Sequence, residues 1–163
     1  MEEGIHVTVA QMPNVKLKAE LIYTKYDSIV PAKAFAYKKD PVTQETIELI
    51  KPRTHKFENS LKEELSKQLD DSSIFPVSEE ILVSIILGLH AEKEYQTCDL
   101  DNRIKTILDA LKSVIYIDDR QVKMIWSEKV FLRSENNSFF QIKIKILNDK
   151  IINQIKKYLG GLI

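Results

Sequence analysis

The sequence predicts an α+β domain in which helices pack against a mixed β-sheet, and two patterns carry this prediction. Segments with alternating apolar and polar residues occur near both ends of the chain, and segments with a helical period lie between and after them. With 163 residues, 44% of them hydrophobic and 29% charged, the chain is long enough to bury one continuous core. We therefore expect a single domain over residues 1–163.

The predicted strands differ in how they would be buried. Residues 5–9 and 15–21 alternate, which predicts an N-terminal hairpin. Residues 80–89 are apolar and rich in β-branched side chains, which predicts a central strand covered on both faces. Further strands are predicted at residues 43–50, 121–132 and 139–147.

Three segments have the apolar spacing of amphipathic helices. After Thr54, apolar side chains recur every fourth residue as far as Leu69. From Asp101 onward, an apolar face borders a face of acidic and basic residues, so this helix would hold charged side chains beside the core. Residues 149–159 predict an additional C-terminal helix with its own apolar face.

The charge balance does not predict a polyanionic partner for the molecule as a whole. There are 24 basic and 24 acidic residues, so a nucleic-acid surface would have to be local. Each basic residue that we consider for DNA binding has ordinary solvated surface charge as its alternative explanation. These candidates are Arg53, Lys56, Lys93, Lys143 and Lys145.

Composition also limits the cellular location and the kinds of site that the chain could form. The chain starts with acidic residues, and its apolar runs are too short to cross a bilayer, so we expect a cytoplasmic protein without a membrane partner. A single cysteine, Cys98, excludes an internal disulfide, and the three histidines lack metal-ligand spacing. Cys98 and Trp126 are both expected to be buried.

Aspartates are concentrated around the helix that starts near Asp101. Asp99 and Asp101 precede or begin it, and alternation in an extended approach would point both carboxylates the same way; Asp118 and Asp119 follow it. Carboxylates gathered in one place repel each other unless a cation such as Mg²⁺ or Mn²⁺ neutralises them. With Lys105 nearby, this set predicts metal-assisted phosphodiester hydrolysis.

Each of these residues also has an ordinary structural explanation. Asp101 alone would be a helix N-cap, Asp118 and Asp119 would form a turn, and Lys105 would form an ion pair one helical turn from an acid. A plain scaffold built from such caps and turns is one alternative. It does not explain why Asp99 adds a second carboxylate beside Asp101.

Three spaced blocks together resemble a known family. Residues 99–105 read Asp-Leu-Asp-Asn-x-x-Lys, residues 108–111 read Leu-Asp-Ala-Leu, and residues 118–122 read Asp-Asp-x-Gln-Val. This pattern resembles the RusA family of Holliday junction resolvases from bacteria and their prophages. The resemblance implies a RusA-like fold and a homodimeric, Mg²⁺- or Mn²⁺-dependent endonuclease that cuts four-way (branched) DNA junctions in recombination and repair.

The resemblance also implies roles for individual residues. Asp99, Asp101 and Asp119 match the family's essential, metal-binding carboxylates, and Lys105 matches its catalytic lysine. Supporting roles are implied for Asn102, Asp109 and Asp118, with Lys105 as the expected partner of Asp109. Residues 95–98 lack the basic residues that family members usually carry there. A catalytically weak or inactive relative that binds branched nucleic acid or a protein partner therefore stays open.

Overall fold

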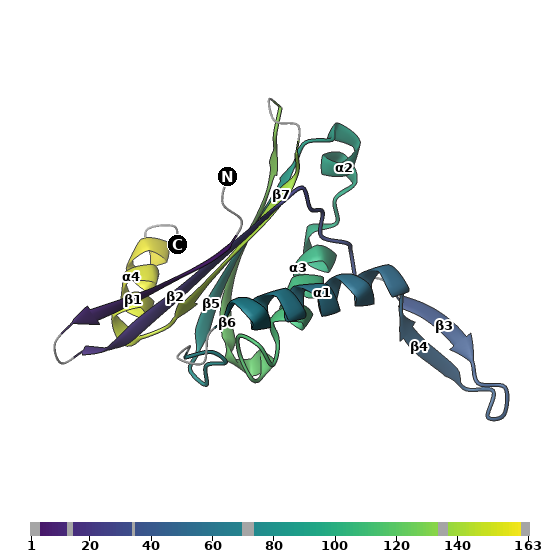
Figure 1. Cartoon of the computed structure of the whole chain (residues 1–163), viewed down its shortest axis with the longest axis horizontal. Helices are drawn as coiled ribbons and strands as arrows, with labels where there is room; N and C mark the ends of the chain where they lie inside the picture. Colours follow the sequence, from purple (N-terminus) through teal and green to yellow (C-terminus); the bar gives the residue numbers. More distant parts are fainter. Residues whose placement is uncertain (1–3, 13–14, 34, 70–73, 134–136, 161–163) are drawn as a thin grey trace.

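The computed structural model describes residues 4–12, 15–33, 35–69, 74–133 and 137–160, and it confirms the α+β class (Figure 1). Five strands form one mixed sheet in the order β1-β2-β7-β5-β6, and two further strands form a separate hairpin. The strands are β1 (Gly4–Met12), β2 (Val15–Tyr26), β3 (Phe35–Lys39), β4 (Thr46–Ile50), β5 (Ile81–Leu89), β6 (Val122–Phe131) and β7 (Phe139–Ile146).

The helices agree with the three expected amphipathic segments and add two short ones, α2 and η1. They are α1 (Pro52–Gln68), α2 (Glu92–Thr97), α3 (Leu100–Leu111), α4 (Asp149–Gly160) and the 3₁₀ helix η1 (Asp119–Gln121). Pro52 occupies the first position of α1, where its fixed φ and missing N–H suit a helix start. The sequence did not predict α2, whose residues are polar and have no buried face that would produce a helical apolar pattern.

The direction of the strands determines where the site residues lie. β7 inserts between β2 and β5 and is antiparallel to both, whereas β5 and β6 run parallel. Parallel neighbours need a crossover, and here α2 and α3 provide it. The end of β5 and the start of β6 lie at opposite ends of the strands, and α3 spans the distance between them.

The core lies between one face of the sheet and the helices α1 and α3. Its fully buried side chains include Leu65 of α1, Ile107 of α3 and, from β5, Ile81, Val83 and Ile85. The intervening β5 side chains are only partly buried until the end of the strand. The expectation that β5 is covered on both faces is therefore wrong, because the helices of the core cover one face.

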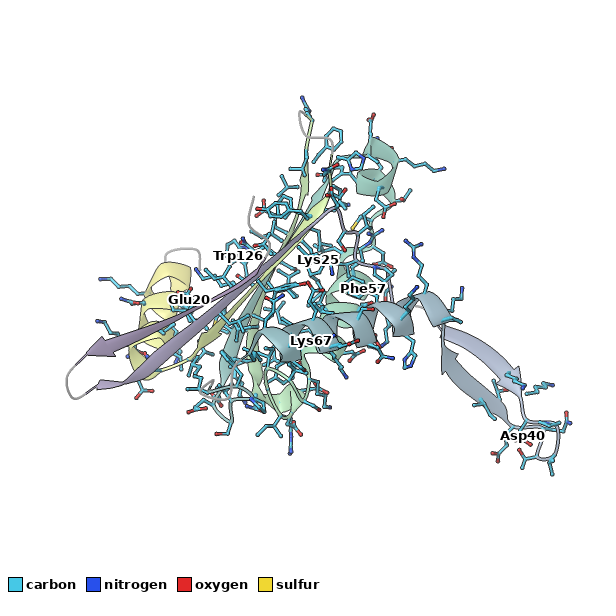
Figure 2. All side chains as sticks on the ribbon, viewed as in Figure 1. Glu20, Lys25, Asp40, Phe57, Lys67 and Trp126 are labelled. Atoms are coloured by element: carbon cyan, nitrogen blue, oxygen red, sulfur yellow. The ribbon has the colours of Figure 1, made fainter. Side chains whose placement is uncertain are left out.

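Other expectations about individual elements have mixed outcomes. Cys98 is buried as expected, whereas Trp126 is 61% exposed because it lies on β6, at the edge of the sheet (Figure 2). The N-terminal hairpin and the C-terminal helix are both present. None of the described helices combines the length and apolar character needed to cross a membrane.

The β3–β4 hairpin extends away from the sheet, beyond the start of α1 (Figure 1). Asp40 lies at its tip (Figure 2), where its carboxylate accepts hydrogen bonds from the N–H groups of Thr43 and Val42 at 2.8 and 2.7 Å. These bonds, with Thr43 contributing most, hold the pKa of Asp40 below its usual value. The hairpin turn is thus fixed by a local side-chain to backbone motif.

Candidate active site

Two carboxylates meet in an exposed position at the start of α3. Asp99 is the N-cap residue, but its side chain makes no capping bond; its Oδ2 instead accepts a hydrogen bond of 2.5 Å from Nδ2 of Asn102. Hydrogen bonding with the Asp101 carboxyl, and then with Asn102, holds the pKa of Asp99 below its usual range. Asp101 lies in the first turn, so the alternative that it is the N-cap is wrong.

The segment before Asp99 is held by a lysine from β6. The expected extended approach is wrong over most of its length, because α2 lies between β5 and Asp99, and between α2 and α3 only Cys98 and Asp99 have extended backbone. Nζ of Lys129 donates to the carbonyl oxygens of Tyr95 at 3.0 Å and Cys98 at 3.3 Å. The same ammonium lies 4.9 Å from the centre of the Tyr95 ring, which adds a cation–π contact. These contacts tie the α2–α3 connection, and with it Asp99, to the sheet.

Lys105 lies on the same helix as Asp101, four residues later, and is exposed. Side chains four residues apart on a helix lie on the same face. Lys105 is therefore placed on the face of α3 that carries Asp101, as the sequence predicts.

The other predicted carboxylates are at the far end of α3. Asp118 is the N-cap of η1, and its side chain forms a capping box with Gln121. Arg120 also binds the Asp118 carboxylate through its side chain at 2.8 Å and its backbone N–H at 2.9 Å, which lowers the pKa of Asp118 to about 2. Asp119 forms a salt bridge of 2.8 Å with Lys112, the C-cap residue of α3.

The length of α3 separates these two groups of acids. Twelve helical residues span roughly 18 Å at about 1.5 Å per residue, and Asp99 and Asp119 lie at opposite ends of this helix. Because β6 is parallel to β5, the start of β6 lies at the opposite end of the strands from the end of β5, which leads to Asp99. In the part of the chain that the structure describes, no group of three or more His, Cys, Asp or Glu side chains is arranged to hold a metal ion.

Asp109, in the last turn of α3, takes part in an ion network with the buried side chains of Lys33 and Glu58. Nζ of Lys33 lies 2.7 Å from Oδ2 of Asp109 and 2.5 Å from Oε1 of Glu58 on α1. Burial lowers the pKa of Lys33, but hydrogen bonds to Asp109 and Glu58 outweigh it and raise the pKa overall. Lys33 was not among the predicted site residues, although the apolar residues 30–32 directly before it were a signal of burial.

The structure does not gather the predicted DNA-binding cations on one surface. Arg53 and Lys56 are exposed near the start of α1, and Lys93 is exposed on α2. Lys143 and Lys145 alternate with buried residues of β7, so they lie on the sheet face opposite the core. Lys143 also forms a salt bridge of 2.6 Å with Glu20 of β2.

A comparison with known protein families shows to which family this chain belongs. The family model described as Endodeoxyribonuclease RusA matches residues 27–146, well over half of the chain. The chain belongs to the RusA family. The matched region contains both ends of α3 and the β3–β4 hairpin, whereas β1, β2 and α4 lie outside it. Membership in the RusA family supports a nuclease of the Holliday junction resolvase type. No curated protein matches the chain.

Proposed function

We propose that this RusA-family protein is a divalent-metal-dependent endonuclease that cuts four-way DNA junctions in recombination and repair. The observation that carries the proposal is the pair of exposed carboxylates, Asp99 and Asp101, in mutual contact at the start of α3. Two neighbouring carboxylates repel each other when both are ionised, and a bound cation offsets this repulsion. The pair lies inside the region that matches the RusA family.

The residues of this pair fit Mg²⁺ or Mn²⁺. Mg²⁺ is typically held by one or two carboxylates together with waters and substrate phosphate oxygens. Asp99 and Asp101 provide hard oxygen ligands, and the Asn102 amide fixes the orientation of Asp99. The bound ion would supply positive charge against the oxygens of the phosphate. Lys105, one turn along, would offset negative charge that develops during cleavage.

Asp119 would complete the site only if a second copy of the chain supplied it. Within one chain, the length of α3 keeps Asp119 away from Asp99. Two copies related by a two-fold axis, with their α3 helices antiparallel, would bring the end of one helix to the start of the other. We therefore propose a homodimer with two such sites, which is also what two symmetric cuts in a four-way junction require.

The direct test is cleavage of a synthetic four-way junction by the wild type and by Asp101→Asn, in Mg²⁺ and in Mn²⁺. Asp149→Asn is the matched control, since Asp149 is also an exposed aspartate in the first turn of a helix. We expect the control to cut like the wild type, and Asp101→Asn to lose cleavage while still binding the junction. Equal cutting by all three proteins would contradict the role assigned to Asp101.

The second candidate is a relative that binds junctions without cutting them. It is favoured by the salt bridge that already neutralises Asp119 with Lys112 of the same chain. Junction affinity, measured in EDTA, separates the two functions. Tight binding in EDTA without cutting in either metal would support the binding protein.

A further inference from the structure

A hollow of about 340 Å³ lies beside the start of α1. Residues 29–32 form one wall, and the charged side chains around it are Lys51, Arg53, Arg103 and Glu94. We call it the α1 hollow. Three cations and one carboxylate give it an excess of two positive charges, in a chain whose total charge is zero. Its volume is at the low end of the ~300–1,000 Å³ range of ligand pockets, which suits a small anionic group.

The first turn of α1 adds donors to this excess charge. The N-cap residue Lys51 makes no side-chain capping bond, and the first turn contains no acidic residue. Pro52 has no N–H, so the donors of this turn are the N–H groups of Arg53 and Thr54, which have no partner within the helix and favour anions. Thr54 lies at the third position of the helix, and its hydroxyl donates to the carbonyl oxygen of Ala32 at 3.2 Å.

Arg103 provides the independent observation that points to an anion. It is 8% exposed; its Nη1 donates to the Val30 carbonyl oxygen at 2.9 Å, and its Nη2 binds Glu94. Its Nε is buried and has no hydrogen-bond partner among the described residues. An unsatisfied buried donor is costly, and guanidinium groups readily satisfy their donors with phosphate oxygens.

The α1 hollow is also next to the carboxylate pair. Arg103 lies on α3 one turn after Asp99, and its backbone N–H donates to the Asp99 carbonyl oxygen at 3.2 Å. The same residue therefore borders both the hollow and the proposed cleavage site. A DNA strand whose phosphate lies at Asp99 and Asp101 would carry a neighbouring phosphate toward Arg103.

We propose that the α1 hollow binds a phosphate of the DNA backbone that neighbours the phosphate to be cut. Lys51, Arg53 and the first turn of α1 bind its oxygens, and Arg103, which lines the hollow from α3, adds a further positive charge beside it. This assignment rests on the proposed nuclease function for its ligand. The chemistry it requires is that of any phosphate, so the test separates free phosphate from DNA.

The test compares two double variants with equal charge change. The hollow variant is Lys51→Gln with Arg53→Gln; both side chains are exposed, so folding should be preserved. The control is Lys62→Gln with Lys67→Gln, toward the other end of the same helix (Figure 2). Glu94→Gln forms a third arm, because it removes the only carboxylate that lines the hollow among the described residues.

Inorganic phosphate is the first probe, titrated in EDTA at constant ionic strength and followed by ³¹P NMR. We expect saturable binding to the wild type and the control, and binding about tenfold or more weaker to the hollow variant. Glu94→Gln should bind phosphate more tightly than the wild type. Equal affinity in the hollow variant and the control would overturn the phosphate site.

A four-way junction is the second probe, also in EDTA so that no cutting occurs. The slope of log affinity against log salt should fall by about 0.9 in the hollow variant relative to the control, which is the effect of one lost phosphate contact. Single neutral methylphosphonates placed near the branch should weaken junction binding by the wild type at one position. The same replacement should leave junction binding by the hollow variant unchanged.

Two results would overturn the assignment to DNA. Identical salt slopes and methylphosphonate effects in the hollow variant and the control would show that no backbone phosphate uses the hollow, and phosphate binding alone would then assign it to a free anion. If the protein failed to bind junctions at all, the proposed function would fail, while the phosphate titration would still report on the hollow. The two failures are therefore distinguishable.

Discussion

The two ends of α3 carry similar acidic residues in different surroundings. At the C-terminal end, Asp118 is bound to Arg120 and Asp119 to Lys112. At the N-terminal end, Asp99 contacts a second carboxyl and an amide. The acids at the C-terminal end are therefore neutralised within the chain, whereas the pair at the N-terminal end is the one that we propose to bind a cation. Density of aspartates in a sequence does not by itself tell these two situations apart.

Mixing two inactive variants gives the strongest test of whether the two ends work together. If Asp119 of one copy joins Asp99 and Asp101 of another, then Asp101→Asn and Asp119→Asn are each inactive, but mixed dimers contain one intact site. An equal mixture should recover about a quarter of the intact sites, because half of its dimers are mixed and each has one such site of two. Nicking of a four-way junction measures this recovery.

Sites contained within one chain predict a different result for the same mixture. Each subunit of a mixed dimer would then lack one essential carboxylate, and no activity would return. A mixture as inactive as its components would refute the shared site. Subunit exchange is checked separately by mixing two differently tagged wild-type copies and recovering both tags in one pull-down.

Mn²⁺ affinity should also differ between variants at the two ends of α3. We expect Asp99→Asn and Asp101→Asn to weaken Mn²⁺ binding about 10–100-fold or more, since each removes a ligand where even the loss of a supporting group has such an effect. Asp118→Asn should change it little, because Arg120 already holds that carboxylate. Titration of Mn²⁺ followed by electron paramagnetic resonance measures all three. Equal weakening by Asp118→Asn would contradict the contrast between the two ends.

The sequence predicted the local parts of this contrast and missed the long-range ones. The amphipathic pattern of α3 and the pairing of Asp99 with Asp101 depend on residues close in sequence, and both are present. The position of Asp119 depends on the direction of β6, which follows from the pairing of distant strands. The crossover between the parallel strands β5 and β6 places the start of β6 at the end of the sheet opposite Asp99.

The sequence also did not predict the buried charged residues, again because their contacts come from distant segments. Lys33 meets Glu58 and Asp109, which lie in two different helices, so no local spacing connects the three residues. Arg103 shares its helix face with Ile107 and Ala110, which was a usable signal of burial. Its contacts with Val30 and Glu94 come from separate segments. Exposure of Trp126 likewise follows from the edge position of β6, which the sequence does not specify.

The ion network around Lys33, which reaches α3 at Asp109, should matter for stability more than the salt bridge between Lys112 and Asp119. Lys33→Met leaves the buried Glu58 carboxylate without its ammonium, and breaking a buried pair typically costs about 3–5 kcal/mol. We expect a fall in the melting temperature of about 6–20 °C, at ~2–4 °C per kcal/mol for a chain of this size. Calorimetry measures it, and Lys33→Met with Glu58→Gln should recover part of the loss. An unchanged melting temperature would show that the network is not stabilising.

The salt bridge between Lys112 and Asp119 should have the smallest effect. Its side chains are 42% and 63% exposed, and exposed ion pairs contribute about 0–1 kcal/mol. Lys112→Met should therefore lower the melting temperature by no more than ~4 °C. Because this change leaves the Asp119 carboxylate intact, we also expect junction cutting to be retained, in contrast to Asp119→Asn. Loss of cutting in Lys112→Met at normal stability would mean that the lysine, and not only the carboxylate, acts at the site, so that the C-terminal end of α3 does more than neutralise its own charge.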